Sequence, residues 1–195
     1  MTTLALRPGA MPWRAVLIAT GLGAIVAARW AATVSLLADP ILVGAAFGSA
    51  LLIVAVAGGL RVERPTATAV VTGVVGGLVL VGVAVVGRLG STVPSTPLPV
   101  AFAPWALATV LVATAEEAVL RGALFGALDE RAGTIAAVLV TSAAFALMHV
   151  PLYGWGVVPL DFGVGLWLAG LRLVSGGIAA PALAHALADL ATWWL

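Results

Sequence analysis

Acidic, basic and imidazole side chains lie inside stretches of the chain that are otherwise almost entirely apolar. They include both histidines and half of the four glutamates, and in chain order they are Arg29, Glu116, Glu117, Arg121, His149, His185 and Asp189. An ionised side chain at the centre of a bilayer costs about 2.5–3.5 kcal/mol on insertion scales. These residues therefore need a partner or a function, and carboxylates together with imidazoles are the groups of general acid–base catalysis.

The densest cluster is the segment Ala115-Glu116-Glu117-Ala118-Val119-Leu120-Arg121. Glu117 and Arg121 stand four residues apart, which places them on one helix face in the order that favours an ion pair. Glu116 is rotated by about 100° from Glu117, so it is free to face a neighbouring helix and to act as a general base. A structural charge cluster that holds helices together would explain the same residues.

The two histidines belong to two further predicted helices. The midpoint between Glu117 and His149 is residue 133, inside the polar turn 129–133, so a hairpin folded there brings both side chains to the same depth. His185 and Asp189 lie four residues apart on one helix face, where the carboxylate can orient the imidazole and fix its tautomer. Structural hydrogen bonding is the alternative for each histidine alone. Together, the three segments predict a buried site of carboxylates and imidazoles.

The elements that position these groups must be apolar helices. The chain has 195 residues, of which 63% are hydrophobic and 9% charged, whereas a soluble domain carries about 25% charged residues. We predict an all-α, polytopic bundle of transmembrane helices. The net charge of +1 provides no basic patch for nucleic acid, and the absence of cysteine excludes thiol catalysis and disulfides.

About seven apolar stretches are long enough to cross a hydrocarbon layer of ~30 Å. They run from Ala15 to Leu37, Ile41 to Leu60, Thr66 to Gly87, Ala101 to Leu128, Ala132 to Val150, Val157 to Val174 and Gly177 to Leu195. Pro181 should kink or begin the last one. We interpret residues 1–195 as a single integral membrane domain, with three leading helices in 1–100 and the motif-bearing helices in 101–195. The Pro/Ser/Thr-rich segment from Ser91 to Pro99 separates the two groups.

The arginines indicate how the chain is oriented in a membrane. A cytoplasmic N-terminus places six of them on the inner side, namely Arg7, Arg14, Arg61, Arg64, Arg131 and Arg172, and leaves only Arg88 outside. This asymmetry follows the positive-inside rule. We therefore predict a multi-pass protein of the cell membrane with its N-terminus in the cytoplasm.

Three motifs in this order resemble the CAAX-protease and bacteriocin-processing family (CPBP, or Abi) of intramembrane endopeptidases. The family pattern is Glu-Glu-x-x-x-Arg, then Phe-x-x-x-His, then His-x-x-x-Asn/Asp. In this sequence the pattern spans 74 residues and reads Glu116-Glu117…Arg121, Phe145…His149 and His185…Asp189.

The resemblance implies a glutamate-dependent endopeptidase that hydrolyses peptide bonds of a membrane-associated protein or peptide without a cofactor. It implies that Glu116 and His149 activate water and that His185, with the residue at position 189, stabilises the oxyanion. Glu117, Arg121 and Phe145 would support the site. Many family members have Asn at the last position, whereas an ionised Asp189 cannot donate a hydrogen bond to an oxyanion. Asp189 is therefore either protonated or orients His185.

Three alternatives remain open. Two histidines and a carboxylate can form a catalytic zinc site, although the chain has no His-Glu-x-x-His motif. The chain could instead be a non-catalytic membrane protein, such as a bacteriocin self-immunity or scaffold protein. It could also be a proton-coupled transporter that uses the same residues as a relay. The expected partners are the lipid bilayer and a membrane-associated peptide or protein, and the oligomeric state is not determined by the sequence.

Overall fold

The structure is a computed structural model that describes residues 12–35, 39–90 and 100–195. The described residues form eight α-helices and no strand, which confirms the predicted all-α fold. The helices are α1 (Pro12–Thr33), α2 (Pro40–Ala57), α3 (Ala67–Leu89), α4 (Phe102–Glu117), α5 (Phe125–Ala132), α6 (Thr134–Tyr153), α7 (Val158–Ser175) and α8 (Ala179–Ala191). Shorter segments complete the chain: the π-helix η1 (Ala118–Leu124) and the 3-10 turns η2 (Trp155–Val157) and η3 (Thr192–Trp194).

The predicted number of spans agrees with these helices. Six helical segments in the described part are long and apolar enough to cross a membrane, namely Trp13–Thr33, Pro40–Ala57, Ala67–Leu89, Phe102–Ala132, Thr134–Tyr153 and Trp155–Ser175. The seventh predicted span is the 13-residue α8, which measures about 20 Å at ~1.5 Å per residue. Pro181 lies in its first turn, where a missing N–H is tolerated, so the proline begins this helix. Arg7 and the segment from Ser91 to Pro99 lie outside the described residues.

Apolar side chains cover the outside of the bundle. Ile53, Leu107 and Ile135, for example, are 70%, 74% and 79% exposed. The interior contains alanine, leucine and phenylalanine side chains together with the buried acids and arginine. Such an outer surface is unfavourable in water and suits a lipid environment. The distribution is that of a multi-pass membrane protein.

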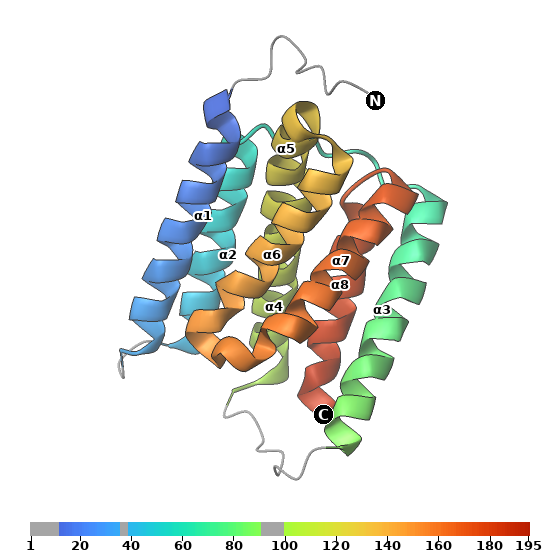
Figure 1. Ribbon diagram of the computed structural model, residues 1–195. Coiled ribbons are helices and arrows are strands. Elements are labelled where there is room, and N and C mark those ends of the chain that lie inside the picture. Colours follow the sequence, from blue (N-terminus) through green and yellow to red (C-terminus); the bar gives the residue numbers. More distant parts are fainter. Residues whose placement is uncertain (1–11, 36–38, 91–99) are drawn as a thin grey trace.

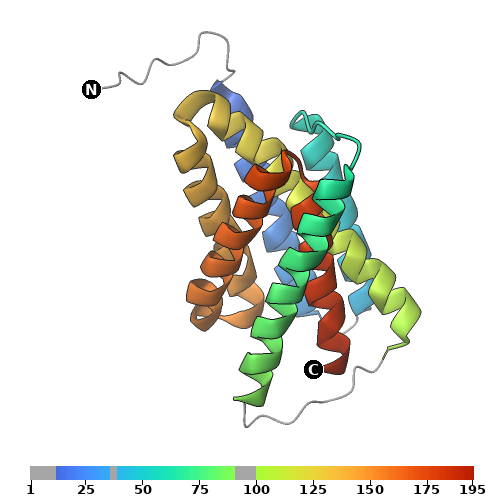
Figure 2. The ribbon, with the colours of Figure 1, turned by 90° about the vertical axis from the view of Figure 1, so that its right-hand side faces the viewer.

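The short helix α8 lies between α3 and α4 and also contacts α7 (Figures 1 and 2). Two glycines of α3 allow this close approach. A Cβ atom at Gly73 would lie 2.9 Å from the Ala180 carbonyl oxygen, and one at Gly77 would lie 3.1 Å from the Ala184 Cα atom. Small residues at this spacing are a common device for packing membrane helices. They fix α8, and with it His185, against the rest of the bundle.

The predicted hairpin turn is present between α5 and α6. Gly133 has a φ of 84°, a left-handed conformation that glycine adopts without strain. Its amide donates to the Asp129 carbonyl oxygen at 3.2 Å, and the Thr134 hydroxyl donates to the Asp129 carboxylate at 2.6 Å. The chain therefore reverses where the sequence places its only polar turn between the Glu and His motifs.

Candidate active site

The fourth predicted span changes from an α-helix to a π-helix immediately after its two glutamates. Residues 118–124 form η1, which contains Arg121. A π segment shifts the hydrogen-bonding register to i→i+5 and is frequent at functional sites. Arg172 of α7 donates to the Arg121 carbonyl oxygen and thereby satisfies a backbone group of this segment. Glu116 is 2% exposed, and Glu117 and Arg121 are fully buried.

The predicted ion pair between Glu117 and Arg121 is present. Arg121 Nη1 donates to Glu117 Oε1 at 2.9 Å, and its Nη2 donates to the Gly165 carbonyl oxygen of α7 at the same distance. The guanidinium also stacks against Phe145, with its Cζ atom 4.9 Å from the ring centroid. A buried charge is tolerated only when it is paired and hydrogen-bonded, and this arrangement supplies both conditions.

Gly165 is the residue that lets α7 reach Arg121. A Cβ atom there would lie 2.9 Å from the Ser142 Cα atom of α6, and backbone cannot move aside by changing a rotamer. We expect Gly165→Ala to lower the unfolding free energy by about 1–3 kcal/mol, the usual cost of overpacking, with a lower Tm in detergent. Gly163→Ala in the same helix is the control, because nothing lies within 4 Å of its Cβ position. Equal melting of both variants would contradict the prediction.

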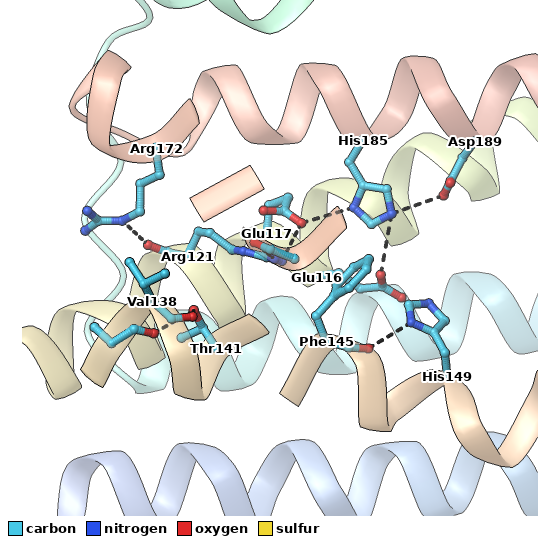
Figure 3. A network of polar contacts seen from close by, with 12 residues as sticks. Glu116, Glu117, Arg121, Val138, Thr141, Phe145, His149, Arg172, His185 and Asp189 are labelled. Atoms are coloured by element: carbon cyan, nitrogen blue, oxygen red, sulfur yellow. Dashed lines mark hydrogen bonds and ion pairs between the residues drawn. The ribbon is translucent and has the colours of Figure 1, made fainter. Parts of the chain in front are cut away.

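His185 lies among three carboxylates (Figure 3). Its Nδ1 is 3.1 Å from Glu117 Oε1, while its Nε2 is 3.5 Å from Asp189 Oδ2 and 3.9 Å from Glu116 Oε2. The sequence led us to expect that Asp189 orients this imidazole, but Glu117 makes the shorter contact. A carboxylate accepts hydrogen bonds, so Nδ1 carries the proton and Nε2 faces Glu116 and Asp189.

His149 is held by its own helix and by α7. Its Nδ1 lies 2.9 Å from the Phe145 carbonyl oxygen and 3.4 Å from Asp161 Oδ2. A carbonyl oxygen can only accept, so Nδ1 is the protonated nitrogen and Nε2 is the available one. The Phe145 ring meets both imidazoles edge-on, with centroids 4.8 Å from His149 and 5.3 Å from His185.

One cavity of about 730 Å³ joins most of the predicted site residues. Glu116, His149, His185 and Asp189 all line it, and so does Phe145. Glu117 and Arg121 do not line the cavity, and they support it through His185 and Phe145. Much of the remaining wall is apolar and comes from α2, α3, α4 and α7.

Two charged residues contact the site in ways that the sequence did not predict. Arg29 was listed among the residues that need a partner, and that partner is Glu116, whose Oε1 lies 3.7 Å from its Nη1. Asp161 was not singled out from the sequence, and it lies beside His149. The signal that could have identified both as site residues is their charge within apolar helices. Neither belongs to one of the three motifs.

Metal ligation has no preformed site in the described part of the chain. No group of three or more His, Asp and Glu side chains there is arranged to hold a metal ion.

Comparison with known proteins supports the motif-based resemblance. A family model described as "Type II CAAX prenyl endopeptidase Rce1-like" matches residues 98–191. Residues 98–191, called here the Rce1-like segment, are similar to this family. The match confirms the resemblance to the CPBP proteases, and it includes every predicted site residue from Glu116 to Asp189. No curated protein and no solved structure matches the chain. The Rce1-like segment covers α4 to α8, so Arg29 reaches the site from outside it.

Proposed function

We propose that this chain is a glutamate-dependent intramembrane endopeptidase that cleaves a membrane-associated peptide or protein. The observation that carries the proposal is the position of Glu116. Its buried carboxylate lines the same cavity as the imidazoles of His149 and His185, and these groups come from three different helices. The match of residues 98–191 to a family model for prenyl endopeptidases supports the same chemistry.

The attacking nucleophile would be a water molecule at Glu116. The Glu116 oxygens are 3.7 Å from Arg29 Nη1 and 3.9 Å from His185 Nε2. Both distances are too long for direct hydrogen bonds, so the Glu116 oxygens can accept from a water molecule in the cavity. Glu116, assisted by His149, takes a proton from the water molecule while the water oxygen bonds to the peptide carbonyl carbon. The same proton passes to the leaving nitrogen when the C–N bond breaks.

The developing oxyanion would be stabilised by His185. Glu117 accepts from its Nδ1, so the imidazolium form of His185, protonated on both nitrogens, would donate from Nε2 to the oxyanion. This division of roles between two ring nitrogens is common where a carboxylate orients an imidazole. Asp189 lies 3.5 Å from the same Nε2, and a carboxylate would repel an oxyanion. We therefore assign Asp189 to orienting His185.

Cleavage of a peptide library tests the proposal. The purified protein in detergent is incubated with peptides from a digested proteome, and new termini are identified by mass spectrometry. We expect cleavage with and without EDTA. Cleavage that EDTA abolishes would instead favour the zinc alternative, and an absence of cleavage would favour the non-catalytic alternative.

Asp161 is expected to act as a positioning residue for His149. Its carboxylate lies 3.4 Å from His149 Nδ1, and Asp161→Asn removes the charge while keeping the shape. Because hydrogen bonds to charged groups contribute about 1.5–3 kcal/mol, we expect kcat to fall roughly tenfold or more with KM unchanged. Asp161→Glu should recover part of the loss.

Asp129→Asn is the matched control for this substitution, since Asp129 lies in the turn and pairs with Thr134. Its cleavage rate should equal that of the wild type. An unchanged kcat in Asp161→Asn would remove Asp161 from the mechanism.

A further inference from the structure

A second cavity of about 300 Å³ adjoins the catalytic cavity. Arg29, Pro40, Gly44 and Tyr153 line both, so the two cavities meet at these residues. The smaller volume lies at the lower end of the range of about 300–1,000 Å³ that is typical of small-ligand sites. It is bounded by the ends of α1, α2 and α6 and therefore lies mainly outside the Rce1-like segment.

The two cavities differ in charge. Glu116, Asp161 and Asp189 line the catalytic cavity. Among the described residues that line the second cavity, only Arg29 is charged. The neighbouring Asp39 is engaged elsewhere, because its carboxylate accepts hydrogen bonds from the first amides of α2 at 2.8 and 3.1 Å. Within the described part of the chain, the second cavity is therefore lined by one cation and no carboxylate, whereas the catalytic cavity has three carboxylates beside Arg29 and the two imidazoles.

Hydroxyl groups add to this polarity. Thr33 and Tyr153 also line the second cavity. The Thr33 hydroxyl donates to the Arg29 carbonyl oxygen at 2.8 Å, while the phenol of Tyr153 can act as a donor to an anion. The rest of the lining is apolar, which strengthens an electrostatic interaction by lowering the local dielectric constant.

The guanidinium of Arg29 has N–H groups that are available to bind a ligand. Its Cζ atom stacks 4.2 Å from the Phe47 ring centroid, and its closest carboxylate contact is the 3.7 Å separation from Glu116. In the described part of the chain, no acceptor lies within hydrogen-bond distance of this guanidinium. Arginine presents five N–H donors in a planar fork that matches a carboxylate. The stacking holds this fork in place, so a ligand meets a preorganised group.

We propose that Arg29 and the second cavity bind a carboxylate of the substrate peptide. This inference rests on the proposed peptidase function and adds a recognition element to it. The carboxylate belongs either to the C-terminus of the peptide or to an Asp or Glu side chain. Because Arg29 lies beside the proposed general base, the bound carboxylate sets which peptide bond reaches Glu116.

The test compares three versions of the best-cleaved peptide from the library. One has a free C-terminal acid, one has a C-terminal amide, and one keeps the free acid but has its Asp and Glu residues replaced by Asn and Gln. Loss of charge-assisted hydrogen bonds should lower kcat/KM of the wild type about tenfold to a hundredfold for one altered peptide. The affected peptide identifies the source of the carboxylate. When the enzyme is the Arg29→Gln variant, kcat/KM for that altered peptide should differ from kcat/KM for the unaltered peptide by less than about threefold.

Two further variants serve as controls. Arg29→Lys keeps the charge but lacks the planar fork of N–H donors. Its kcat/KM ratio between the peptides with and without the carboxylate should lie between those of the wild type and Arg29→Gln. Arg14 lies on the same helix as Arg29 and pairs with Glu130. The Arg14→Gln variant should show the same kcat/KM ratio between the peptides as the wild type. The Tm of each variant in detergent shows that it is folded.

The possible failures are distinguishable. Equal cleavage of the three peptides by the wild type, or full discrimination by Arg29→Gln, would overturn the carboxylate site alone. If the wild type cleaved no peptide, the proposed peptidase function would fail and the carboxylate site with it.

Discussion

Glu116→Gln is expected to reduce peptide cleavage by a factor of about 10²–10⁴, the contribution of a general base. Glutamine keeps the size of the side chain, but its amide cannot take a proton from water at neutral pH. Because the carboxylate is 2% exposed and has only long contacts to Arg29 and His185, the substitution removes a costly buried group. We expect the Tm of the variant to equal or exceed that of the wild type. The measurements are kcat on the best-cleaved library peptide and a thermal melt in detergent.

The matched control for this substitution is Glu130→Gln. Glu130 is 43% exposed, and its partner Arg14 lies 3.4 Å away. Exposed pairs of this kind contribute at most about 1 kcal/mol, so both cleavage and melting should be unchanged. If Glu116→Gln cleaved peptides at the wild-type rate, Glu116 would be a structural charge and the peptidase proposal would lose its central residue.

The fold could be predicted from the sequence because the bilayer leaves few choices. A backbone in hydrocarbon must satisfy its own hydrogen bonds, so long apolar stretches become helices. Polar turns such as 129–133 must leave the membrane, and this fixed the hairpin between α5 and α6. The short length of α8 was less predictable, since its span has the same apolar composition as the others. Its close packing against Gly73 and Gly77 is a tertiary feature.

The candidate site was partly predictable for the same reason. The spacing of Glu117 and Arg121 predicted their ion pair, because helix geometry alone brings positions i and i+4 together. By contrast, nothing in the segment 118–124 signals a π-helix, which is accompanied by the tertiary contact from Arg172. The contacts of Arg29 and Asp161 could not be predicted because their partners lie on other helices. Periodicity gives the face of a helix but not the neighbour that the face meets.

The two halves of the chain have different relations to the site. The Rce1-like segment supplies Glu116 and both imidazoles, which are the groups that would act on the peptide bond. The leading helices supply Arg29 and part of the apolar wall. Substrate selection can therefore be separated from bond cleavage, because residues outside the matched segment can vary without loss of the reacting groups. This separation is the reason why Arg29 variants should change which peptides are cleaved more than whether peptides are cleaved.

Arg121→Met is expected to cause the largest loss of stability of any substitution considered. Removing one partner of a buried ion pair leaves the other charge uncompensated, at a cost of about 3–5 kcal/mol. Glu117 would be that charge, since Arg121 Nη1 is 2.9 Å from its Oε1 and both side chains are fully buried. The hydrogen bond to the Gly165 carbonyl oxygen would also be lost. The Tm of this variant in detergent should fall well below that of the wild type.

A double-mutant cycle separates the ion pair from the packing of Arg121. Glu117→Gln removes the charge that Arg121→Met leaves behind, so the double variant should melt above Arg121→Met alone. The exposed pair Arg14 and Glu130 is the control, and its cycle should give a coupling of less than about 1 kcal/mol. Equal Tm values for Arg121→Met and the double variant would show that packing against Phe145 explains the loss of stability.

Glu117→Gln alone should also lower kcat, because Glu117 holds Nδ1 of His185. Because Glu117→Gln in turn leaves the Arg121 charge uncompensated, its Tm should also fall, and its kcat is measured well below that Tm.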